Sequence, residues 1–464
     1  MHLVWLRNNL RVNDNRPLYD ACASGGPVRV LYAVTPRQWT RHNDAPSKQA
    51  FCQAAFHDLT QTLAALGIET DVIEAPLYDD LSKAFVRYAK THGVTDVWFE
   101  EEIPIHEARR DRAVSVALDQ AGVTVHLLPY PWLVQGGGVH TKSDTPYKMF
   151  TPWYRATMKA LADQRAKPFP APKAQGSALN PKKHVWTEAR FRDDLWPATT
   201  ASAEKRLHYF ITKNLHTYGQ QRDYPGLDLT SRLSPYLTNG LLSLHQCVRA
   251  AWQALLRAGS DPFMDDWIRE LCWREFYGAL MAHFPRLSVG KAFKDKGVPT
   301  AWRDDPKLKR AFEAGETGFP IVDAAVRQLR ETGWMHNRLR MVVASFYCKL
   351  LLLPWWDGEA FFMHHLIDGD FASNNGGWQW CASTGCDASP WFRIFNPLSQ
   401  SRKFDPNGEF ITSMLPGFHD VDPKERHDPS PETRKRLSYP DPIIDYKLAR
   451  ARALDFYGRA ARGS

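Results

Sequence analysis

The sequence has few cysteines and no long apolar run, and both scarcities exclude classes of protein. Seven cysteines occur among 464 residues, and none belongs to a C-x-x-C pair. This odd number without paired spacing indicates reduced thiols and argues against both a disulfide framework and a metal site. The longest apolar stretch, residues 341–356, is interrupted by Lys349 and Pro354 and is too short to cross a bilayer. We therefore expect a soluble, non-secreted protein that binds no metal and no membrane.

Two further absences concern the N-terminal third and the chain as a whole. No G-x-G-x-x-G motif follows a predicted strand, which disfavours a dinucleotide bound in the Rossmann manner, and no internal repeat is present. Short, largely β-branched runs nevertheless alternate with helical patterns that end at Gly67, Gly93 and Gly122. This alternation predicts a doubly wound, Rossmann-like α/β domain with a parallel sheet over residues 1–130. The strands are predicted at 3–6, 28–34, 68–73, 96–99 and 123–128, and the helices at 47–66, 77–92 and 105–121.

The rest of the chain has a different pattern. Residues 131–200 are rich in proline and polar residues, notably at 168–172, and are predicted to form an irregular interdomain linker. From 201 to 464 strand patterns vanish, and helical patterns separated by Gly, Pro or Asn predict an all-α domain. The formal net charge of +8 is compatible with nucleic-acid binding but does not establish it.

Seventeen tryptophans are the most unusual feature of the composition, because such large rings either fill cores or stack on planar ligands. Three clusters combine tryptophan with charged or amide side chains. On a helix, Trp267, Glu270 and Arg274 would share one face, and Trp334 would share another with Met341. The clusters are residues 267–275 (WIRELCWRE), 333–341 (GWMHNRLRM) and 368–380 (DGDFASNNGGWQW).

The third cluster contains two successive glycines, Gly376 and Gly377. Inside an ordinary helix each would cost about 1 kcal/mol, whereas elsewhere they allow positive φ or close approach of a ligand. Two interpretations stay open, a glycine-rich turn between helices and a ligand-contacting segment. A further segment, 230–235 (TSRLSP), places hydroxyls, an arginine and free N–H groups at a helix start. This is phosphate-binding chemistry, with a plain helix cap as the alternative.

Taken in order, these motifs resemble the photolyase and cryptochrome family over nearly the whole chain. The resemblance implies an N-terminal α/β antenna domain and a C-terminal helical domain that holds FAD in a folded conformation. Within the family, the sequence most resembles the bacterial class I enzymes for cyclobutane pyrimidine dimers. Asn337 and Met341 stand where the (6-4) photoproduct enzymes carry two histidines, which argues against that branch. Other matching phrases are residues 5–15 (WLRNNLRVNDN), 230–234 (TSRLS) and 273–277 (WREFY).

The resemblance also implies which residues bind FAD. Arg340 and Asp368 would pair against the isoalloxazine, and Asp370 would contact the flavin or the ribityl chain. Asn374 would lie at the flavin N5, where an amide can hydrogen-bond with either protonation state without adding charge. The rest of the flavin site, including the pyrophosphate and ribityl region, is assigned to Tyr218, Thr230, Ser231, Arg232, Leu233, Ser234 and Trp267.

The implied substrate is DNA containing cyclobutane pyrimidine dimers, with the dimer flipped out at a cost on the order of a few kcal/mol. Trp273 and Trp380 would stack around the dimer, and Met341 would pack on it. Glu270 and Asn337 would hydrogen-bond the pyrimidine edges, and a protonated Glu270 could donate to the radical anion. The residues assigned to DNA phosphates are Arg222, Arg274, Arg338 and Arg393.

The implied reaction is driven by light. Reduced FADH⁻ absorbs blue light and passes an electron to the dimer, the ring splits, and the electron returns. The protein supplies positioning, exclusion of water and electrostatics. Trp378, Trp355 and Trp302 match the chain of tryptophans by which the family reduces its flavin from the surface. For each of these tryptophans taken singly, a place in the core is the alternative.

The antenna site departs from the family pattern. Residues 100–107 follow a predicted strand, where open sheets bind small molecules. Glu107 matches the acid that binds a folate pterin, but His106 replaces the usual Asn, and a Cys-Lys pair is absent near Ser288 and Val289. An acidic first helical turn that binds nothing is the alternative. We expect 5,10-methenyltetrahydrofolate, with a deazaflavin, FMN or no antenna left open.

Two other classes of function stay open. A cryptochrome-type blue-light receptor would reduce the same flavin under light and signal without repairing DNA. A nucleic-acid-binding helical protein without a cofactor would be colourless when purified. The repair interpretation predicts a monomer in the bacterial cytoplasm, associated with the nucleoid and without an obligate protein partner.

Overall fold

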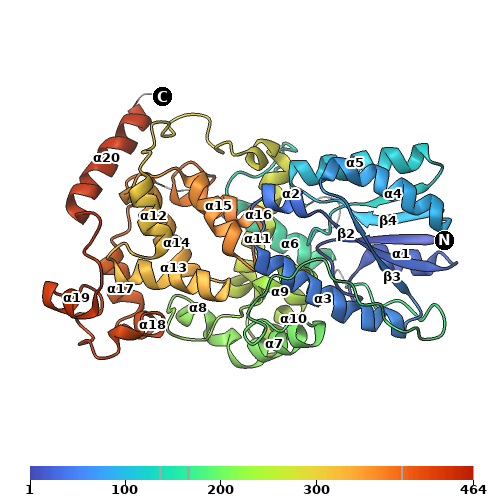
Figure 1. The fold of residues 1–464 in the computed structure, drawn as a ribbon, viewed down its shortest axis with the longest axis horizontal. Coiled ribbons are helices and arrows are strands. Elements are labelled where there is room, and N and C mark those ends of the chain that lie inside the picture. Colours follow the sequence, from blue (N-terminus) through green and yellow to red (C-terminus); the bar gives the residue numbers. More distant parts are fainter. Residues whose placement is uncertain (135–137, 165–167, 388–389, 463–464) are drawn as a thin grey trace. The chain divides into compact units, whose positions relative to one another are not determined.

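The computed structural model describes residues 1–134, 138–164, 168–387 and 390–462, whose helices and strands are labelled in Figure 1. Parallel strands form one sheet with the order β3-β2-β1-β4-β5, which reverses between β1 and β4 as in a doubly wound fold. Every predicted strand is confirmed to within one residue at each end, because β-branched apolar runs are a strong strand signal. The strands are β1 His2–Leu6, β2 Val28–Val34, β3 Glu69–Glu74, β4 Asp96–Glu100 and β5 Thr124–Leu128.

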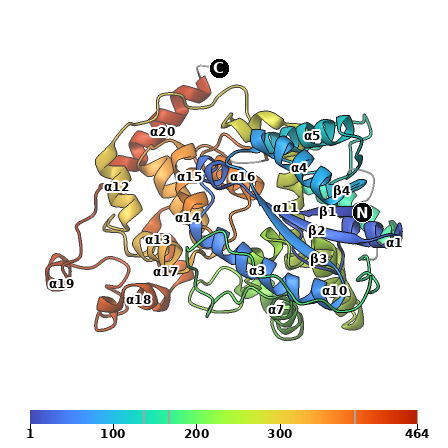
Figure 2. The ribbon, with the colours of Figure 1, turned by 45° about the vertical axis from the view of Figure 1, so that its right-hand side comes forward.

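Helices cover both faces of this sheet, as buried parallel strands require. On one face Trp5 of β1 contacts Phe85 of α4 with ring centroids 4.5 Å apart, and α4 packs against α5. On the other face Tyr32 of β2 contacts Phe56 of α3 at 5.3 Å. Figure 2 shows α4 and α5 on one side of the strands and α3 on the other. The helices between the strands are α1 Arg16–Ala23, α2 Pro36–Arg41, α3 Pro46–Ala65, α4 Tyr78–His92 and α5 Ile105–Gln120.

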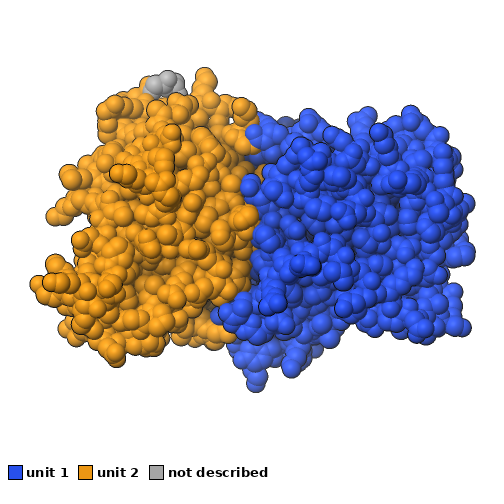
Figure 3. Space-filling view, viewed as in Figure 1, with its two compact units in different colours: residues 1–215, 231–289, 367–370 blue, residues 216–230, 290–366, 371–464 orange. Residues whose placement is uncertain are grey.

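The described residues divide into two compact units, which are coloured separately in Figure 3. Unit 1 comprises Met1–Leu215, Ser231–Val289 and Ile367–Asp370, and unit 2 comprises His216–Thr230, Gly290–Leu366 and the chain from Phe371 onward. Domain boundaries near residues 130 and 200 stay predictions. Besides the sheet and its helices, unit 1 contains α6 Phe150–Gln164, α7 Thr200–Lys213, α9 Ser234–Thr238, α10 Leu244–Arg257 and α11 Asp266–His283.

Helix α6 lies inside the segment that was predicted to be irregular, so that prediction is wrong for residues 150–164. Its Phe150 stacks on Trp273 of α11 with ring centroids 3.6 Å apart, and the Tyr154 hydroxyl donates to the Phe263 carbonyl at 2.9 Å. Apolar residues at positions 150, 153, 154 and 158 have the spacing of one helical face, but the prolines around them outweighed this signal. Residues 135–137 and 165–167 of the predicted linker lie outside the described residues.

The regular secondary structure that is described for unit 2 consists of helices, in agreement with the predicted all-α domain. Its core is an apolar cluster in which Val326 of α13 and Val343 of α14 are buried together with Trp355 and Trp378. Within the described ranges, no helix is both long and apolar enough to cross a membrane. The helices are α8 Tyr218–Gln221, α12 Pro306–Ala314, α13 Pro320–Thr332, α14 Asn337–Ser345, α15 Trp355–His365, α16 Phe371–Cys381, α17 Pro397–Phe404, α18 Glu409–Met414, α19 Pro431–Leu437 and α20 Tyr446–Arg462, with a π-helical turn Phe346–Leu350 after α14.

Candidate functional site

The residues predicted to form the site fall on both units. Unit 1 carries Glu270, Trp273, Arg274, Trp267, Ser231, Arg232, Leu233, Ser234, Asp368, Asp370, His106 and Glu107. Unit 2 carries Tyr218, Arg222, Thr230, Asn337, Arg338, Arg340, Met341, Asn374, Trp380, Arg393, Trp302, Trp355 and Trp378.

Helix α11 supplies the predicted cluster of unit 1. Asp265 caps the helix by accepting a hydrogen bond at 2.8 Å from a first-turn backbone N–H that would otherwise lack a helical partner. Trp267 is buried and packs against Phe210, with ring centroids 4.8 Å apart. Glu270 and Arg274 follow Trp267 at i+3 and i+7, so the three residues share one helical face as predicted.

The segment Ile367–Asp370, which carries two carboxylates predicted to serve the flavin, is held by side chains distant in sequence. Lys48 of α3 donates to the carbonyl of Gly369 at 3.0 Å. At the end of α9, Thr238 donates to the Asp368 carbonyl at 3.3 Å, and Asn239 donates to the Ile367 carbonyl at 3.2 Å. The backbone of the turn is therefore fixed by groups other than its own carboxylates.

Arg274 joins this arrangement through Asp370. One guanidinium nitrogen lies 2.8 Å from a carboxylate oxygen of Asp370, and another donates to the Thr238 hydroxyl at 3.4 Å. The two side chains were predicted for different ligands, DNA and flavin respectively, yet they form an ion pair. Because the charge of Arg274 is compensated, its clearest structural role is to hold Asp370 in place, and its contact with DNA stays a prediction.

The predicted phosphate segment forms a constrained turn before α9. Arg232 has a φ of 49°, a left-handed conformation that is uncommon for residues other than glycine. Leu233 is buried, and Ser234 is the first residue of α9. The hydroxyl-bearing helix start is present as predicted, although the helix itself has only five residues.

Residues 333–341 do not form a single helix, so the predicted shared face of Trp334 and Met341 is wrong. Helix α13 ends at Thr332 and is capped by Gly333, whose φ of 71° is the left-handed conformation that glycine allows without steric cost. Helix α14 begins at Asn337, which places Asn337 and Met341 one turn apart on the same face. The intervening residues belong to a short turn that the helical periodicity concealed.

Two arginines of α14 are engaged inside unit 2. Arg338 lies 2.6 Å from a carboxylate oxygen of Asp223, and its guanidinium carbon is 4.3 Å from the ring centroid of Phe404. The Nε atom of Arg340 donates to the Met335 carbonyl at 2.8 Å. Arg338 was predicted on a DNA phosphate, but its charge is compensated by a carboxylate, so this contact also stays a prediction.

The paired glycines of the third cluster are helical, because α16 runs through both of them. The interpretation as a turn between helices is therefore wrong. A Cβ built at Gly377 would meet no atom of the described chain within 4 Å. Packing therefore does not account for a glycine that costs the helix about 1 kcal/mol relative to alanine. Open space beside a helix backbone suits the close approach of a bound ligand.

A ladder of amide and acid side chains orients α16. Asn375 donates to a Glu359 carboxylate oxygen at 2.8 Å, and Gln379 donates to Asn375 at 2.9 Å. The backbone N–H of Phe293 donates in turn to Gln379 at 2.8 Å. Asn374, beside the ladder, donates to the Glu359 carbonyl at 3.0 Å. Burial raises the pKa of Glu359 to about 7, although the hydrogen bond from Asn375 opposes the shift.

Of the tryptophans predicted to carry electrons, Trp355 lies in α15, Trp378 in α16 and Trp302 before α12. Trp378 and Trp355 are each 2% exposed, whereas Trp302 is half-buried. The ring of Trp378 contacts Phe362 with centroids 4.9 Å apart. Trp355 is the first residue of α15, two turns before Phe362 on the same face. The two buried tryptophans therefore pack along one face of a single helix.

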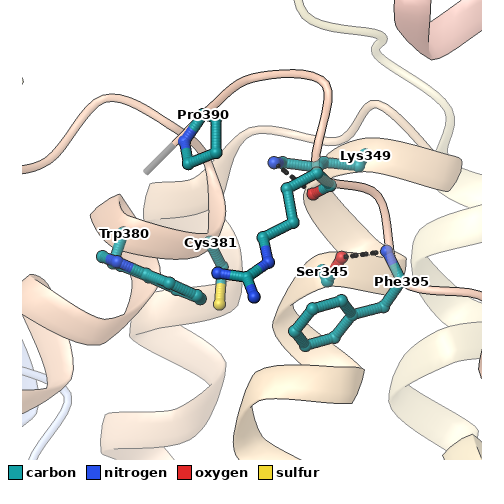
Figure 4. Close-up of a pocket in the computed structure, with 7 residues that line it drawn as sticks. Ser345, Lys349, Trp380, Cys381, Pro390 and Phe395 are labelled. Atoms are coloured by element: carbon teal, nitrogen blue, oxygen red, sulfur yellow. Dashed lines mark hydrogen bonds between the residues drawn. The ribbon is translucent and has the colours of Figure 1, made fainter. Parts of the chain in front are cut away.

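Trp380 and Arg393, both predicted to contact DNA or its lesion, line a small hollow in unit 2. Lys349, in the wall of this hollow, is 3% exposed and donates to the Arg393 carbonyl at 2.8 Å (Figure 4). The Ser345 hydroxyl accepts a hydrogen bond from the Phe395 N–H at 3.5 Å. An aromatic ring and a guanidinium group therefore lie together at one small hollow, and these are the kinds of group that stack on bases and contact phosphates.

The acid predicted to bind an antenna is engaged by its own unit. The Tyr78 hydroxyl donates to a Glu107 oxygen at 3.0 Å, and His42 lies 3.2 Å from the same oxygen and 5.4 Å, ring to ring, from His106. Burial raises the pKa of Glu107, but His42 and Arg110 together with a backbone hydrogen bond lower it by more, so the net pKa lies below its usual value. Ser288 accepts a hydrogen bond from the first N–H of α5 at 3.3 Å.

The sequence-based reasoning missed the residues that hold the site in place. Lys48 lies 321 positions from the carbonyl that it binds, and no local pattern links the two. Thr238 and Asn239 follow the predicted phosphate segment closely, which was the available signal. Asn375 and Gln379 have the i, i+4 spacing of a helical pair, but the neighbouring glycines disguised the helix.

Comparison with protein families gives two matches that follow each other along the chain. A model described as DNA photolyase matches residues 2–173, and a model described as the FAD binding domain of DNA photolyase matches residues 267–459. The deoxyribodipyrimidine photo-lyase of Salmonella typhimurium is 39% identical over 100% of this chain and 99% of its own. The protein of the same name from Escherichia coli is 38% identical, with the same two coverages of 100% and 99%.

Solved structures show the same architecture. A class III photolyase from Agrobacterium tumefaciens superposes with a TM-score of 0.86 at 32% identity, covering 100% of this chain and 98% of its own. A photolyase from Sulfolobus tokodaii, described with two FAD molecules, gives a TM-score of 0.78 at 25% identity. The match covers 99% of this chain and 100% of the Sulfolobus chain.

Proposed function

The chain belongs to the DNA photolyase family, and from this premise we infer that it repairs cyclobutane pyrimidine dimers in DNA under light. The observation that carries this conclusion is the likeness to curated photo-lyases over the full length of both chains. The matches to the DNA photolyase model over residues 2–173 and to the FAD-binding-domain model over residues 267–459 agree with this likeness.

FAD is the cofactor, and features within each unit fit it. In unit 1 the turn that carries Asp368 and Asp370 is fixed through its backbone, so its carboxylates do not have to hold the turn. In unit 2 the helix of Asn374 has open space beside Gly377. When bound, FAD supplies the light-driven one-electron reduction of the dimer. The protein residues supply orientation and charge around it.

Individual residues of the flavin site take the following roles in this proposal. Asn374 donates through Nδ2 to a backbone carbonyl, which leaves its Oδ1 to accept a hydrogen bond from the flavin N5 position. Arg340 and Asp368 bring opposite charges to the isoalloxazine, and Asp370, held by Arg274, contacts the flavin or the ribityl chain. The remaining contacts are assigned to Tyr218, Thr230, Ser231, Arg232, Leu233, Ser234 and Trp267.

The lesion is bound by aromatic, amide and acidic groups. Trp273 and Trp380 stack on the flipped-out pyrimidines, because ring faces bind any base without reading its edge. Glu270 and Asn337 hydrogen-bond the pyrimidine edges, and a protonated Glu270 can donate to negative charge that develops on the dimer. Met341 packs one turn from Asn337 on α14 and supplies an apolar contact.

Four arginines were assigned to DNA phosphates, and they differ in whether a carboxylate of the protein already compensates their charge. Arg274 and Arg338 each pair with a carboxylate, at 2.8 Å and 2.6 Å respectively. Arg393 lines the hollow beside Trp380, and Arg222 lies with its guanidinium carbon 5.7 Å from the ring centroid of Tyr218. We therefore assign the main phosphate contact to Arg393, and Arg222, Arg274 and Arg338 are proposed as further contacts.

The antenna of unit 1 is proposed to be 5,10-methenyltetrahydrofolate, bound through Glu107 and His106. The proposal rests on the family resemblance at Glu107, whose carboxylate already accepts from Tyr78 and faces His42. A deazaflavin, FMN or the absence of an antenna are the other outcomes. Release of the chromophores by mild heat, followed by chromatography against standards, separates these outcomes directly.

The substrate determines the proposed location and assembly. Dimers form in chromosomal DNA, so the enzyme works on the nucleoid in the bacterial cytoplasm. We propose that it acts as a monomer without an obligate protein partner. Light scattering of the FAD-loaded protein at several concentrations tests the oligomeric state.

The test of function uses a dimer-containing oligonucleotide and chemically reduced, FAD-loaded protein. Under illumination, intact thymines reappear with the wild type, and repair falls several-fold with Glu270→Ala and Asn337→Ala. Asn214→Ala, at the C-terminal end of α7, serves as a matched amide control and retains repair. Flavin photoreduction without the loss of any dimer identifies a cryptochrome-type receptor, and a colourless protein excludes both functions.

A further inference from the structure

Trp356 is a surface tryptophan that lies between two of the tryptophans predicted to carry electrons. Its ring centroid is 5.7 Å from that of Trp355 and 6.2 Å from that of Trp302, and both contacts are edge-to-face. Among the described residues, Trp302 and Trp355 make no direct ring contact with each other. All three rings belong to unit 2. Trp356 therefore bridges the inner and outer members of the predicted chain.

Exposure also distinguishes Trp356 from the other members. Trp356 is 43% exposed, whereas Trp355 is 2% exposed. Trp302, the predicted outermost member, is half-buried and contacts Phe456 and Tyr457 of α20 with ring centroids 5.5 and 6.2 Å apart. The most solvent-exposed ring of this group is therefore Trp356.

We propose that Trp356 is an electron donor for light-driven reduction of the flavin and the point where the tryptophan chain reaches solvent. This inference rests on the proposed function, because it requires FAD as the electron acceptor. It adds to the predicted Trp378, Trp355 and Trp302 a residue that no sequence motif singled out. Trp302 becomes a neighbour reached through Trp356 and is not the required terminus.

The physical reason is the cost of holding a positive charge in the protein interior. A tryptophan that gives up one electron becomes a cation, and an ion taken out of water costs several kcal/mol, on the order of the penalties known for buried charges. Trp355 has almost no exposed surface, whereas nearly half of Trp356 can be hydrated. Transfer of the positive charge from Trp355 to Trp356 is therefore favourable and opposes its return.

Reduction of the flavin by this path moves electrons and one proton in a balanced sequence. One electron passes to the photoexcited flavin from Trp378, which is refilled from Trp355, which is refilled in turn from Trp356. Oxidised Trp356 loses its indole N–H proton to water and becomes a neutral radical. An external thiol then supplies one electron and one proton, which restores Trp356 and leaves the flavin reduced by one electron.

The test compares Trp356→Phe with Trp302→Phe in FAD-loaded protein whose flavin is oxidised, in the presence of a thiol. Phenylalanine keeps an aromatic ring but is much harder to oxidise. We expect Trp356→Phe to lower the rate of flavin photoreduction and the yield of the long-lived tryptophan radical several-fold, as followed by transient absorption. Trp302→Phe should retain most of both signals. Trp98→Phe, in the sheet of unit 1, is the matched control and should behave as the wild type.

The opposite ranking would overturn the inference: loss in Trp302→Phe with full photoreduction in Trp356→Phe assigns the terminus to Trp302. An unchanged radical yield in Trp356→Phe together with lower thermal stability assigns a packing role to the ring. Repair of dimers by chemically reduced protein reports separately on the proposed function, because that assay does not use the tryptophans. Loss of repair with the expected photoreduction results would overturn the repair function and leave the electron path intact.

Discussion

The six-membered ring of Trp378 in α16 lies against the backbone of Gly358 in α15, so closely that a Cβ at position 358 would overlap it. Gly358 is one turn after Trp355, on the face of α15 that also carries Phe362. The closeness of the two helices is therefore determined by the absence of a side chain at one position. The position of Trp378, one of the two buried tryptophans of the predicted electron path, depends on that contact.

Alanine at position 358 should consequently push Trp378 out of its place. Overpacking of this kind costs about 1–3 kcal/mol, so Gly358→Ala should lower the free energy of unfolding by that amount. Urea denaturation of the FAD-loaded protein measures the loss. The displaced ring should also slow flavin photoreduction, which is followed by absorbance under blue light.

Gly377→Ala provides the matched control, because it makes the same change in the neighbouring helix at a position with no atom within 4 Å. In the protein freed of FAD it should raise helix stability by about 1 kcal/mol, the usual difference between the two residues. Equal effects of the two substitutions would contradict the assigned contact between Trp378 and Gly358. Loss of FAD or DNA affinity in Gly377→Ala would identify what approaches the open side of α16.

The salt dependence of DNA binding should separate the four candidate arginines. Each phosphate contact on duplex DNA contributes about 0.9 to the slope of log affinity against log salt concentration. Arg393→Ala should therefore reduce the slope by nearly that amount. Arg338→Ala should change it less, because Asp223 already compensates the charge at 2.6 Å.

Fluorescence anisotropy with a dimer-containing duplex at several salt concentrations measures these slopes. Arg459→Ala is the control, because Arg459 is exposed and pairs with Asp455 on the same helix at 2.5 Å. It should leave the slope unchanged. A larger change for Arg338→Ala than for Arg393→Ala would reverse the assignment of phosphate contacts.

The fold of unit 1 was predictable because its signals are local. Each strand is a short β-branched run, and helices α3, α4 and α5 lie within one residue of the predicted bounds. The helix break before Asn337 was not predictable from periodicity alone, since the apolar spacing continues through Gly333. Helix α16 was not predicted, because two glycines have a low intrinsic propensity for helix. In the folded protein, tertiary structure overrides this propensity.

The predicted site residues came from motifs, whereas the residues that position them came only from the structure. Lys48 and Asn239 hold the turn at Ile367–Asp370 through backbone carbonyls, and such bonds leave no trace in composition or spacing. The ion pair of Arg274 with Asp370 joins two motifs that had been assigned to different ligands. Local sequence patterns carry no information about contacts between residues that are far apart in the chain.

The buried acid Glu275 should make stability depend on pH. Its side chain is 4% exposed, and burial raises its pKa to about 8 even though the Leu133 N–H donates to one carboxylate oxygen at 2.6 Å. The folded pKa is above the unfolded value, so folding binds a proton between them. Stability is therefore greatest at low pH and falls as pH rises toward 8, by about 1.4 kcal/mol per unit of pKa difference at most.

Glu275→Gln removes this titration while keeping an oxygen for the Leu133 N–H. Relative to the wild type, the variant should gain stability steadily between pH 5 and roughly pH 8, as measured by urea denaturation. Glu331→Gln on α13 removes an exposed carboxylate and is the control. If the free energy of unfolding differs between the wild type and Glu275→Gln by the same amount across this pH range, Glu275 is not held uncharged by the fold.

Lys349 should act as the anchor of the loop that carries Arg393. Its ammonium group donates to the carbonyls of Arg393 and Trp391 at 2.8 and 3.5 Å. Lys349→Met keeps most of the unbranched side chain but leaves these buried acceptors without a donor, at a cost of about 1–3 kcal/mol. Affinity for dimer-containing DNA should fall with the loss of loop order, while the FAD content should stay unchanged.

The pH dependence of stability gives a second, independent test of the role of Lys349. Burial lowers the pKa of Lys349 to about 8, below its usual value of 10.5, so the folded protein holds fewer protons than the unfolded chain between these values. Stability of the wild type should therefore rise relative to Lys349→Met as pH increases from 8 to about 10. Lys294→Met, which removes a donor to the Ser383 carbonyl at 3.0 Å, is the control for losing a lysine hydrogen bond elsewhere. Equal losses of DNA affinity in the two variants would show that Lys349 has no special connection to the Arg393 loop.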